Sequence, residues 1–292
     1  MRRCATVQTK HTKESGIHEI WSRLKKNRVA LISLFVIIFI ALVAILAPIL
    51  APYSYDLQNT KHTLAGSSKE YLLGTDRLGR DILSRLIWGS RQSLQMGVIA
   101  IAISTFFGII LGAISGYYGG WTDNLIMRLL DIYQGIPMLL LTVTLAAVLG
   151  PSLRNAIIAI GIGMVPGTAR LMRASILTVR EMEYIEAAKS INASDARIIL
   201  MHIIPNAIAP IIVNVTMGIG TCIMAGAALS FVGLGAQPPI PEWGAMISDA
   251  RNYMRGHATL ALYPGICIMI TVLAFNLLGD GLRDALDPRL KS

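Results

Sequence analysis

The chain has 292 residues, of which 54% are hydrophobic and only 15% are charged. This composition is typical of a membrane protein and not of a soluble globular domain. The net charge of +9 indicates membrane topology and contact with anionic lipids, and it argues against a nucleic-acid partner.

Apolar runs without Asp, Glu, Lys or Arg mark the candidate membrane spans. The first run, Val29 to Leu50, extends about 33 Å as a helix and is long enough to cross a bilayer. A shorter run, Asn155 to Ala169, spans only if it continues past Arg170, whose side chain can snorkel to the interface. The remaining runs are 92–121, 132–153, 207–241 and 256–279. Long uninterrupted runs suit helices and not barrel strands, so the sequence predicts an all-α polytopic membrane protein with six transmembrane helices.

The distribution of Lys and Arg predicts the orientation. With the N-terminus inside, 17 of the 26 Lys and Arg residues fall on the inner side, so both termini are expected in the cytoplasm. The first span is expected to be an uncleaved helix, because its apolar region is too long for a signal peptide. The predicted organisation is a cytoplasmic tail (1–28), a first transmembrane helix (29–50), an external loop (51–91), a five-helix core (92–280) containing a cytoplasmic loop (178–206), and a cytoplasmic tail (281–292).

Two short amphipathic helices are expected outside the spans. Apolar residues at helical spacing within 16–26 indicate a helix on the inner leaflet, or else a frayed tail that only sets topology. In the external loop, the turn-rich segment 74–81 precedes an apolar helical face over 82–87, with Asp81 near its positive end. The turn segment has neither EF-hand nor P-loop spacing, so a capping turn is favoured over an ion or phosphate site.

Small residues recur every four positions in the second and fifth spans. Such stripes let two helices approach closely, within a bundle or against a second membrane subunit. The two stripes are Ser104, Gly108, Gly112 and Gly116, and Gly218, Cys222, Gly226 and Ser230.

Catalytic and ion-relay patterns are missing from the spans. The chain lacks H-E-x-x-H and a Walker A sequence, its five His residues show no metal-ligand spacing, and no acid lies at the centre of a span. A non-enzymatic chain without a cofactor or metal is therefore expected, with any ATP site on another polypeptide. The polar groups inside the spans either line a transport pathway or make hydrogen bonds between helices; the pathway candidates are Gln134, Asn214, Thr216 and Asn276.

The cytoplasmic loop 178–206 carries the most informative pattern. Glu186 lies on a charged helix and can reach a basic residue of a partner, while Ala187 and Ala188 provide a small patch for close approach. Asn192 can turn the chain through the left-handed region. Ser194 or Asp195 is placed to cap a second short helix, and Pro205 stands near the start of the next span. A helix–turn–helix docking loop is predicted.

These residues resemble a known family. Glu186-Ala187-Ala188, a turn and Pro205 are similar to the EAA loop of inner-membrane permeases of bacterial ABC importers. Further stretches resemble the "C"-type subunits of the dipeptide/oligopeptide/nickel branch: 73–85, 116–120, 230–235, 242–244 and 286–289. The family usually has Gly where this chain has Asn192.

The resemblance implies a type I ABC importer permease fold in the bacterial or archaeal cell membrane. It implies a second homologous permease subunit, two cytoplasmic ATPase subunits that receive the 178–206 loop, and an external solute-binding protein, with membrane lipids around them. Di- or oligopeptides are the expected cargo, and nickel, a metal chelate, glutathione or opine-like solutes are the alternatives. A membrane anchor that holds a cytoplasmic partner without moving solute is the competing function.

Overall fold

The computed structural model describes residues 21–286, and within them the regular structure is helical apart from one isolated bridge between Thr75 and Asp81. The longer helices are α2 (Arg28–Ile45), α4 (Ile82–Tyr118), α5 (Gly120–Gln134), α6 (Met138–Leu149), α7 (Leu153–Arg180), α11 (Ala209–Phe231) and α13 (Thr259–Leu286). Shorter elements are α3 (Ala47–Leu50), η1 (Thr60–His62), α8 (Glu183–Ser190), α9 (Asp195–Arg197), η2 (Ile198–Ile203), α10 (Ile204–Ala207), α12 (Trp243–Ala250) and η3 (Arg251–Tyr253).

Five of these helices, α2, α4, α7, α11 and α13, are long and apolar enough to cross a membrane. The helices α5 and α6 meet at 84°, and taken together they count as a sixth, broken span. The predicted all-helical membrane architecture is confirmed, with six spans when this pair is counted as one, and α7 continues past Arg170.

The third span differs from its prediction. The apolar run 132–153 predicted one continuous span, but the helix α5 already begins at Gly120 and the break falls at 135–137. Pro137 explains the break, because proline disfavours helical backbone at the preceding residue. Asp131 on α5 bonds Arg170 on α7 at 2.5 Å.

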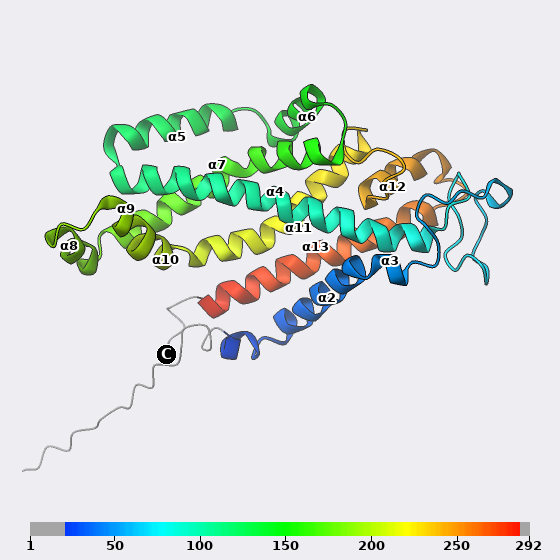
Figure 1. The fold of residues 1–292 in the computed structure, drawn as a ribbon, viewed down its shortest axis with the longest axis horizontal. Coiled ribbons are helices and arrows are strands. Elements are labelled where there is room, and N and C mark those ends of the chain that lie inside the picture. Colours follow the sequence, from blue (N-terminus) through cyan, green and yellow to red (C-terminus); the bar gives the residue numbers. More distant parts are fainter. Residues whose placement is uncertain (1–20, 287–292) are drawn as a thin grey trace, which may run out of the picture.

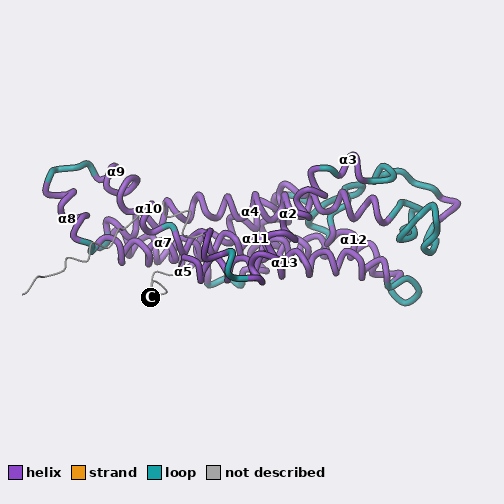
Figure 2. The backbone as a smooth tube through the Cα atoms, turned by 90° about the horizontal axis from the view of Figure 1, so that it is seen from below, coloured by secondary structure: helices purple, strands orange, loops and turns teal. Residues whose placement is uncertain are grey.

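The long helices run roughly side by side along the longest axis of the molecule (Figure 1). The start of α2 and the end of α13 lie at the end that carries α8–α10, while 51–81 and α12 lie at the opposite end. Figure 2 shows the same separation in the perpendicular view. The structure thus places α8–α10 and residues 51–81 at opposite ends of the bundle.

The two small-residue stripes hold the centre of the bundle. Ser104 on α4 shares a 2.9 Å hydrogen bond with Thr168 on α7. A Cβ added at Gly112 would lie 2.7 Å from the Cβ of Met172, and one at Gly218 on α11 would lie 2.5 Å from Ile101 Cδ1 on α4. Both stripes serve close helix packing inside this chain, with α7 and α11 on α4, as the spacing predicted.

The short amphipathic helix expected within 51–91 is not a separate element. Residues 82–91 are the first turns of the 37-residue α4. Asp81 caps this helix as predicted, accepting the Ser84 N–H at 2.8 Å. Gly89 does not interrupt it, and a Cβ there would lie 2.7 Å from Trp243 on α12. Residues 16–20 of the helix predicted over 16–26 lie outside the described residues, and 21–24 form a helical turn.

Candidate functional site

The 178–206 loop folds as the predicted helix–turn–helix. Asn192 has φ +56°, in the left-handed region. Its N–H donates to Lys189 O at 2.9 Å, and the Ala193 N–H donates to Ala188 O at 3.2 Å. This pair of bonds is the Schellman ending of a helix, in which glycine or asparagine takes the left-handed position. Asn192 therefore ends α8 by the mechanism that the sequence indicated.

The two faces of α8 have opposite environments. Ile185 and Ala188 are buried against residues of α7 and η2, in a cluster with Ile176 and Ile198. The prediction that both alanines form an exposed patch is therefore wrong for Ala188, while Ala187 is exposed. Which alanine faces inward depends on how α8 packs on α7.

The outer face of α8 is free for a partner. Tyr184, Ala187 and Ile191 follow helical spacing, and Ile191 is 80% exposed. Glu186 stands beside them, exposed, and within residues 21–286 no Lys or Arg pairs with its carboxylate. An apolar stripe next to an unpaired carboxylate is suited to a protein surface that offers an apolar groove and a basic side chain.

The second half of the loop leads directly into the next span. The chain is helical from Asp195 to Ala207, with a widened turn at η2, and Pro205 lies exposed in the first turn of α10. Ser194 precedes this helix but makes no side-chain cap, so the capping prediction is wrong for Ser194. Asp195 makes a bond to another helix instead.

The C-terminal end of α4 gathers the polar contacts around the loop. Tyr117 donates its hydroxyl to Asp195 Oδ1 at 2.6 Å, and the Lys189 ammonium lies 5.8 Å from the centre of its ring. Arg180 donates to the carbonyls of Gly116 and Tyr117 at 3.0 and 3.2 Å. A cation beside the last carbonyls of a helix satisfies groups that have no partner within the helix.

A salt bridge between Arg173 on α7 and Asp123 on α5 joins three helices, because α4 also contributes to it. Both nitrogens of the Arg173 fork bond Asp123 on α5, the Nε bond being 2.5 Å, and Ser115 on α4 donates to the same carboxylate. The pattern was not recognised in the sequence, because the bonded pairs are 8 and 50 positions apart.

The pathway candidates are not joined by the structure. Gln134 is exposed at the α5–α6 break, while Asn214 and Asn276 lie half-buried on α11 and α13. Within residues 21–286 the side chains of these three residues make no hydrogen bond. Thr216 bonds Ile212 O of its own helix at 2.9 Å. A pathway role for these residues stays a prediction.

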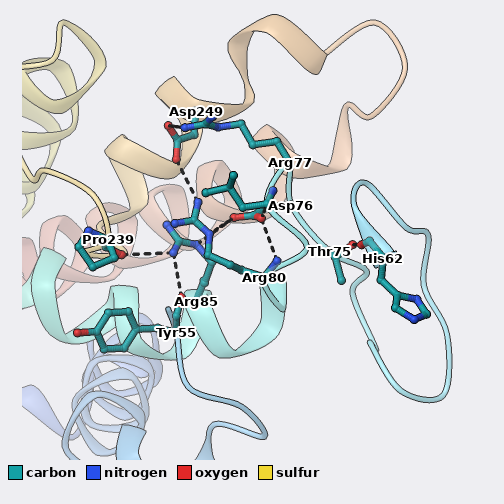
Figure 3. Close-up of polar contacts among 10 residues, drawn as sticks. Tyr55, His62, Thr75, Asp76, Arg77, Arg80, Arg85, Pro239 and Asp249 are labelled. Carbon is teal, nitrogen blue, oxygen red and sulfur yellow. Dashed lines mark hydrogen bonds and ion pairs between the residues drawn. The ribbon is translucent and has the colours of Figure 1, made fainter. Parts of the chain in front are cut away.

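At the opposite end, an arginine network ties the external segment to α12 (Figure 3). Arg80, only 2% exposed, bonds Asp76 at 2.6 Å and Asp249 at 3.5 Å. Arg85 donates to the carbonyls of Tyr55 at 3.0 Å and Pro239 at 3.4 Å. We call Asp76, Arg80, Arg85 and Asp249 the external clamp, since they join three segments of the chain.

Glu242 strengthens the same contact. Its side chain is fully buried. Its carboxylate accepts the N–H groups of Gly244 and Ala245 at 2.9 Å, and the hydroxyl of Ser93 on α4 at 3.0 Å. The Trp243 indole donates to Leu86 O at 3.1 Å. The sequence signal for this role is an acid directly before a helix, where it caps free N–H groups.

The family models match both parts of the chain. Residues 108–292 match the model described as "Binding-protein-dependent transport system inner membrane component", and residues 15–66 match the "N-terminal TM domain of oligopeptide transport permease C".

Similar proteins cover nearly the whole chain. A dipeptide transport system permease protein DppC of Alkalihalophilus pseudofirmus is 48% identical, covering 98% of this chain and 94% of the relative. The DppC of Haemophilus influenzae is 47% identical, covering 95% of this chain and 96% of the relative. A glutathione transport system permease protein GsiD of Escherichia coli O157:H7 is 46% identical, covering 94% of this chain and 91% of the relative.

Solved structures agree on the fold. A chain of the inward-facing MetNI methionine ABC transporter aligns with a TM-score of 0.56 at 21% identity, covering 70% of this chain and 97% of that chain. A chain of an amino acid ABC transporter aligns with a TM-score of 0.54 at 16% identity, covering 70% of this chain and 95% of that chain. With its helical spans and these matches, the chain belongs to the inner-membrane component family of binding-protein-dependent transport systems, as a non-catalytic permease subunit of the type I ABC importer fold.

Proposed function

We propose that this chain is the permease subunit of an ATP-driven importer of dipeptides and short oligopeptides. The observation that carries this proposal is the 47–48% identity, over at least 95% of the chain, to two proteins named as dipeptide permeases. At that similarity the packing of α4, α7 and α11 and the lining of any pathway between subunits are expected to be closely alike.

The coupling mechanism follows from α8. Its exposed face seats in a groove of a cytoplasmic ATPase subunit, with Ile191 and Tyr184 in the groove and Glu186 paired with a basic residue of that subunit. Closure of the ATPases on ATP then displaces the loop, and the buried side of α8 passes this displacement to the bundle. Because the permease itself needs only to move, no cofactor is required on this chain.

The assembly contains a second, homologous permease and an external solute-binding protein, in the cell membrane. Residues 51–81 and α12 form the external face that receives the binding protein. Both chain termini lie on the cytoplasmic side, in agreement with the excess of Lys and Arg there.

Glutathione is the second candidate substrate. A relative named as a glutathione permease is 46% identical over 94% of the chain, nearly as similar as the dipeptide permeases. Glutathione is itself a tripeptide, so both substrates share amide groups and a terminal carboxylate. Nickel or a metal chelate is the further alternative that the sequence resemblance left open.

The test is ATPase activity of the reconstituted transporter, containing its binding protein, with dipeptides, tripeptides, glutathione and nickel. Stimulation by di- and tripeptides with none by glutathione or nickel is expected. Stimulation by glutathione alone, or by nickel alone, would overturn the peptide assignment while leaving the permease role intact. The substitution Ile191→Glu should abolish binding of the ATPase subunits, with Leu200→Glu, exposed on η2, as the matched control.

A further inference from the structure

We propose that Tyr117 is the positioning residue that passes movement of the coupling loop to α4. The proposal rests on the function above, in which α8 binds an ATPase, and adds the route by which the loop acts on the bundle. Tyr117 is the penultimate residue of α4, at the end of the bundle that carries α8–α10.

Tyr117 contacts both halves of the loop at once. Its hydroxyl donates to Asp195, at the start of the second helical segment. Its ring lies under the Lys189 ammonium, near the end of α8. The ring also packs against the buried cluster that contains Ile185 and Ile198. One side chain therefore holds the segments before and after the Asn192 turn.

Other contacts at this end tie α4 to different elements. Arg180 holds the last carbonyls of α4 from α7, and Asp123 joins α4 to α5 and α7. Within residues 21–286, the hydrogen bond that joins α4 to the part of the loop after residue 182 is donated by the Tyr117 hydroxyl. A displacement of α8 and α9 relative to α7 thus reaches α4 through this ring and its hydroxyl.

The contacts at the opposite end of α4 explain how the Tyr117 contact can affect transport. As one 37-residue helix, α4 extends about 55 Å. Its outer turns carry Arg85, which belongs to the external clamp, and Ser93, which bonds the buried Glu242. A helix held at both ends transmits a tilt from the loop to α12, so Tyr117 links the ATPase side to the face that receives the solute.

The chain offers a matched pair for the test. Tyr118, the next residue, is 55% exposed, and within the described chain its hydroxyl makes no hydrogen bond. Tyr117→Phe removes the bond to Asp195 and keeps the ring, while Tyr118→Phe makes the same chemical change without that loss. The measurement is dipeptide uptake per ATP hydrolysed in proteoliposomes, with radiolabelled dialanine as probe, or glutathione if the substrate panel selects it.

Tyr117→Phe is expected to keep the ATPase subunits bound and to lower uptake per ATP about fivefold, the scale of one intramolecular hydrogen bond. Asp195→Ala should reproduce the loss of uptake per ATP. Asp195→Asn keeps an acceptor oxygen and should restore much of that uptake. The double variant Tyr117→Phe, Asp195→Ala should lose no more uptake than either single variant. Tyr118→Phe should behave as wild type.

Two results would overturn the proposal: uptake per ATP in Tyr117→Phe equal to that in Tyr118→Phe, or loss of the ATPase subunits from Tyr117→Phe, which would show a merely structural role. The two proposals fail separately. The proposed function requires that Ile191→Glu lose the ATPase subunits, whereas the role of Tyr117 requires that they stay bound while transport falls.

Discussion

At the scale of single residues, the turn at Asn192 depends on a backbone conformation that few side chains accept. Its φ of +56° lies in the left-handed region, where the Cβ of most residues is crowded by the following carbonyl oxygen. Glycine and asparagine adopt this region most readily. The Schellman bonds around it hold α8 at a set angle to η2. Asparagine here therefore preserves the turn that the family usually makes with glycine.

The first prediction concerns this residue. Asn192→Gly should leave assembly with the ATPase subunits unchanged, whereas Asn192→Val should cost about 1–2 kcal/mol locally, because a β-branched side chain strains the left-handed region. Limited proteolysis of the loop in the purified transporter would detect the strain as faster cleavage. Ser190→Val, two residues earlier at an exposed position, is the control. Equal protection of both valine variants from cleavage would contradict the argument.

Arg80 is the second residue whose environment decides its role. Its guanidinium is almost fully buried between Asp76 and Asp249, which come from two segments far apart in the chain. A planar fork can bond two carboxylates at once, and an ammonium group cannot copy that geometry.

We expect Arg80→Ala to lower the free energy of unfolding by about 3 kcal/mol, since it leaves a partly buried Asp76 carboxylate without its nearest cation. Arg80→Lys should recover only part of this loss. Thermal unfolding of the purified chain in detergent measures both. Arg91→Ala, at an exposed position on the adjoining helix α4, should change little. A similar loss of stability in that variant would show that the clamp is not the cause.

At the scale of elements, the contact between α4 and α7 depends on missing side chains. A Cβ at Gly112 would meet the backbone of Ala169 and Arg173 as well as Met172, so the helices have no room to adjust without separating. Close approach of this kind is a main source of helix association in membranes, where burial of apolar surface gives little driving force.

Gly112→Leu should therefore destabilise the bundle by roughly 1–3 kcal/mol through overpacking. Gly167 on α7 provides a matched control, because a Cβ there would meet nothing within 4 Å. Gly167→Leu should unfold like wild type when the chain is measured alone in detergent. If both leucine variants melt at the same lowered temperature, the close packing at Gly112 is not what holds the two helices together.

The α5–α6 break is the element that local sequence described least well. The turn chemistry of Gly135 and Pro137 was visible, but the run 132–153 is apolar across it, so hydrophobicity alone predicts a continuous span. Asp123 and Asp131 are held on α5 by Arg173 and Arg170 of α7, and these pairs draw the preceding residues into a helix. The break was missed because the apolar run continues across Pro137, and the ion pairs that hold α5 come from another helix.

At the scale of the whole molecule, the two functional ends are separated along the bundle. The 178–206 loop lies at one end, and residues 51–81 with α12 lie at the other (Figure 1). The excess of Lys and Arg on the loop side predicts that this end faces the cytoplasm.

Cysteine labelling checks this orientation. In a chain whose three native cysteines are replaced by alanine, Leu72→Cys should react with a membrane-impermeant maleimide in intact cells, because Leu72 lies exposed in the external segment. Ile191→Cys should react only after the membrane is opened. The opposite pattern would reverse the assigned topology, and with it the side on which ATPases bind.

The sequence by itself determined the features that depend on local chemistry. Apolar runs defined the spans, small residues at four-residue spacing defined the packing faces, and Asn192 defined the turn after α8, because each property repeats along a short segment. Asp81 as a helix cap belongs to the same class.

The tertiary structure decided which side chains are buried and paired. Ala188 lies inward while Ala187 faces outward, Glu242 is buried on Ser93, and Arg80 bonds Asp249 across 169 positions. These outcomes depend on partners brought together only when α4, α7 and α12 pack. A sequence shows the chemistry of each side chain, but burial and ion pairing are properties of its neighbours in space.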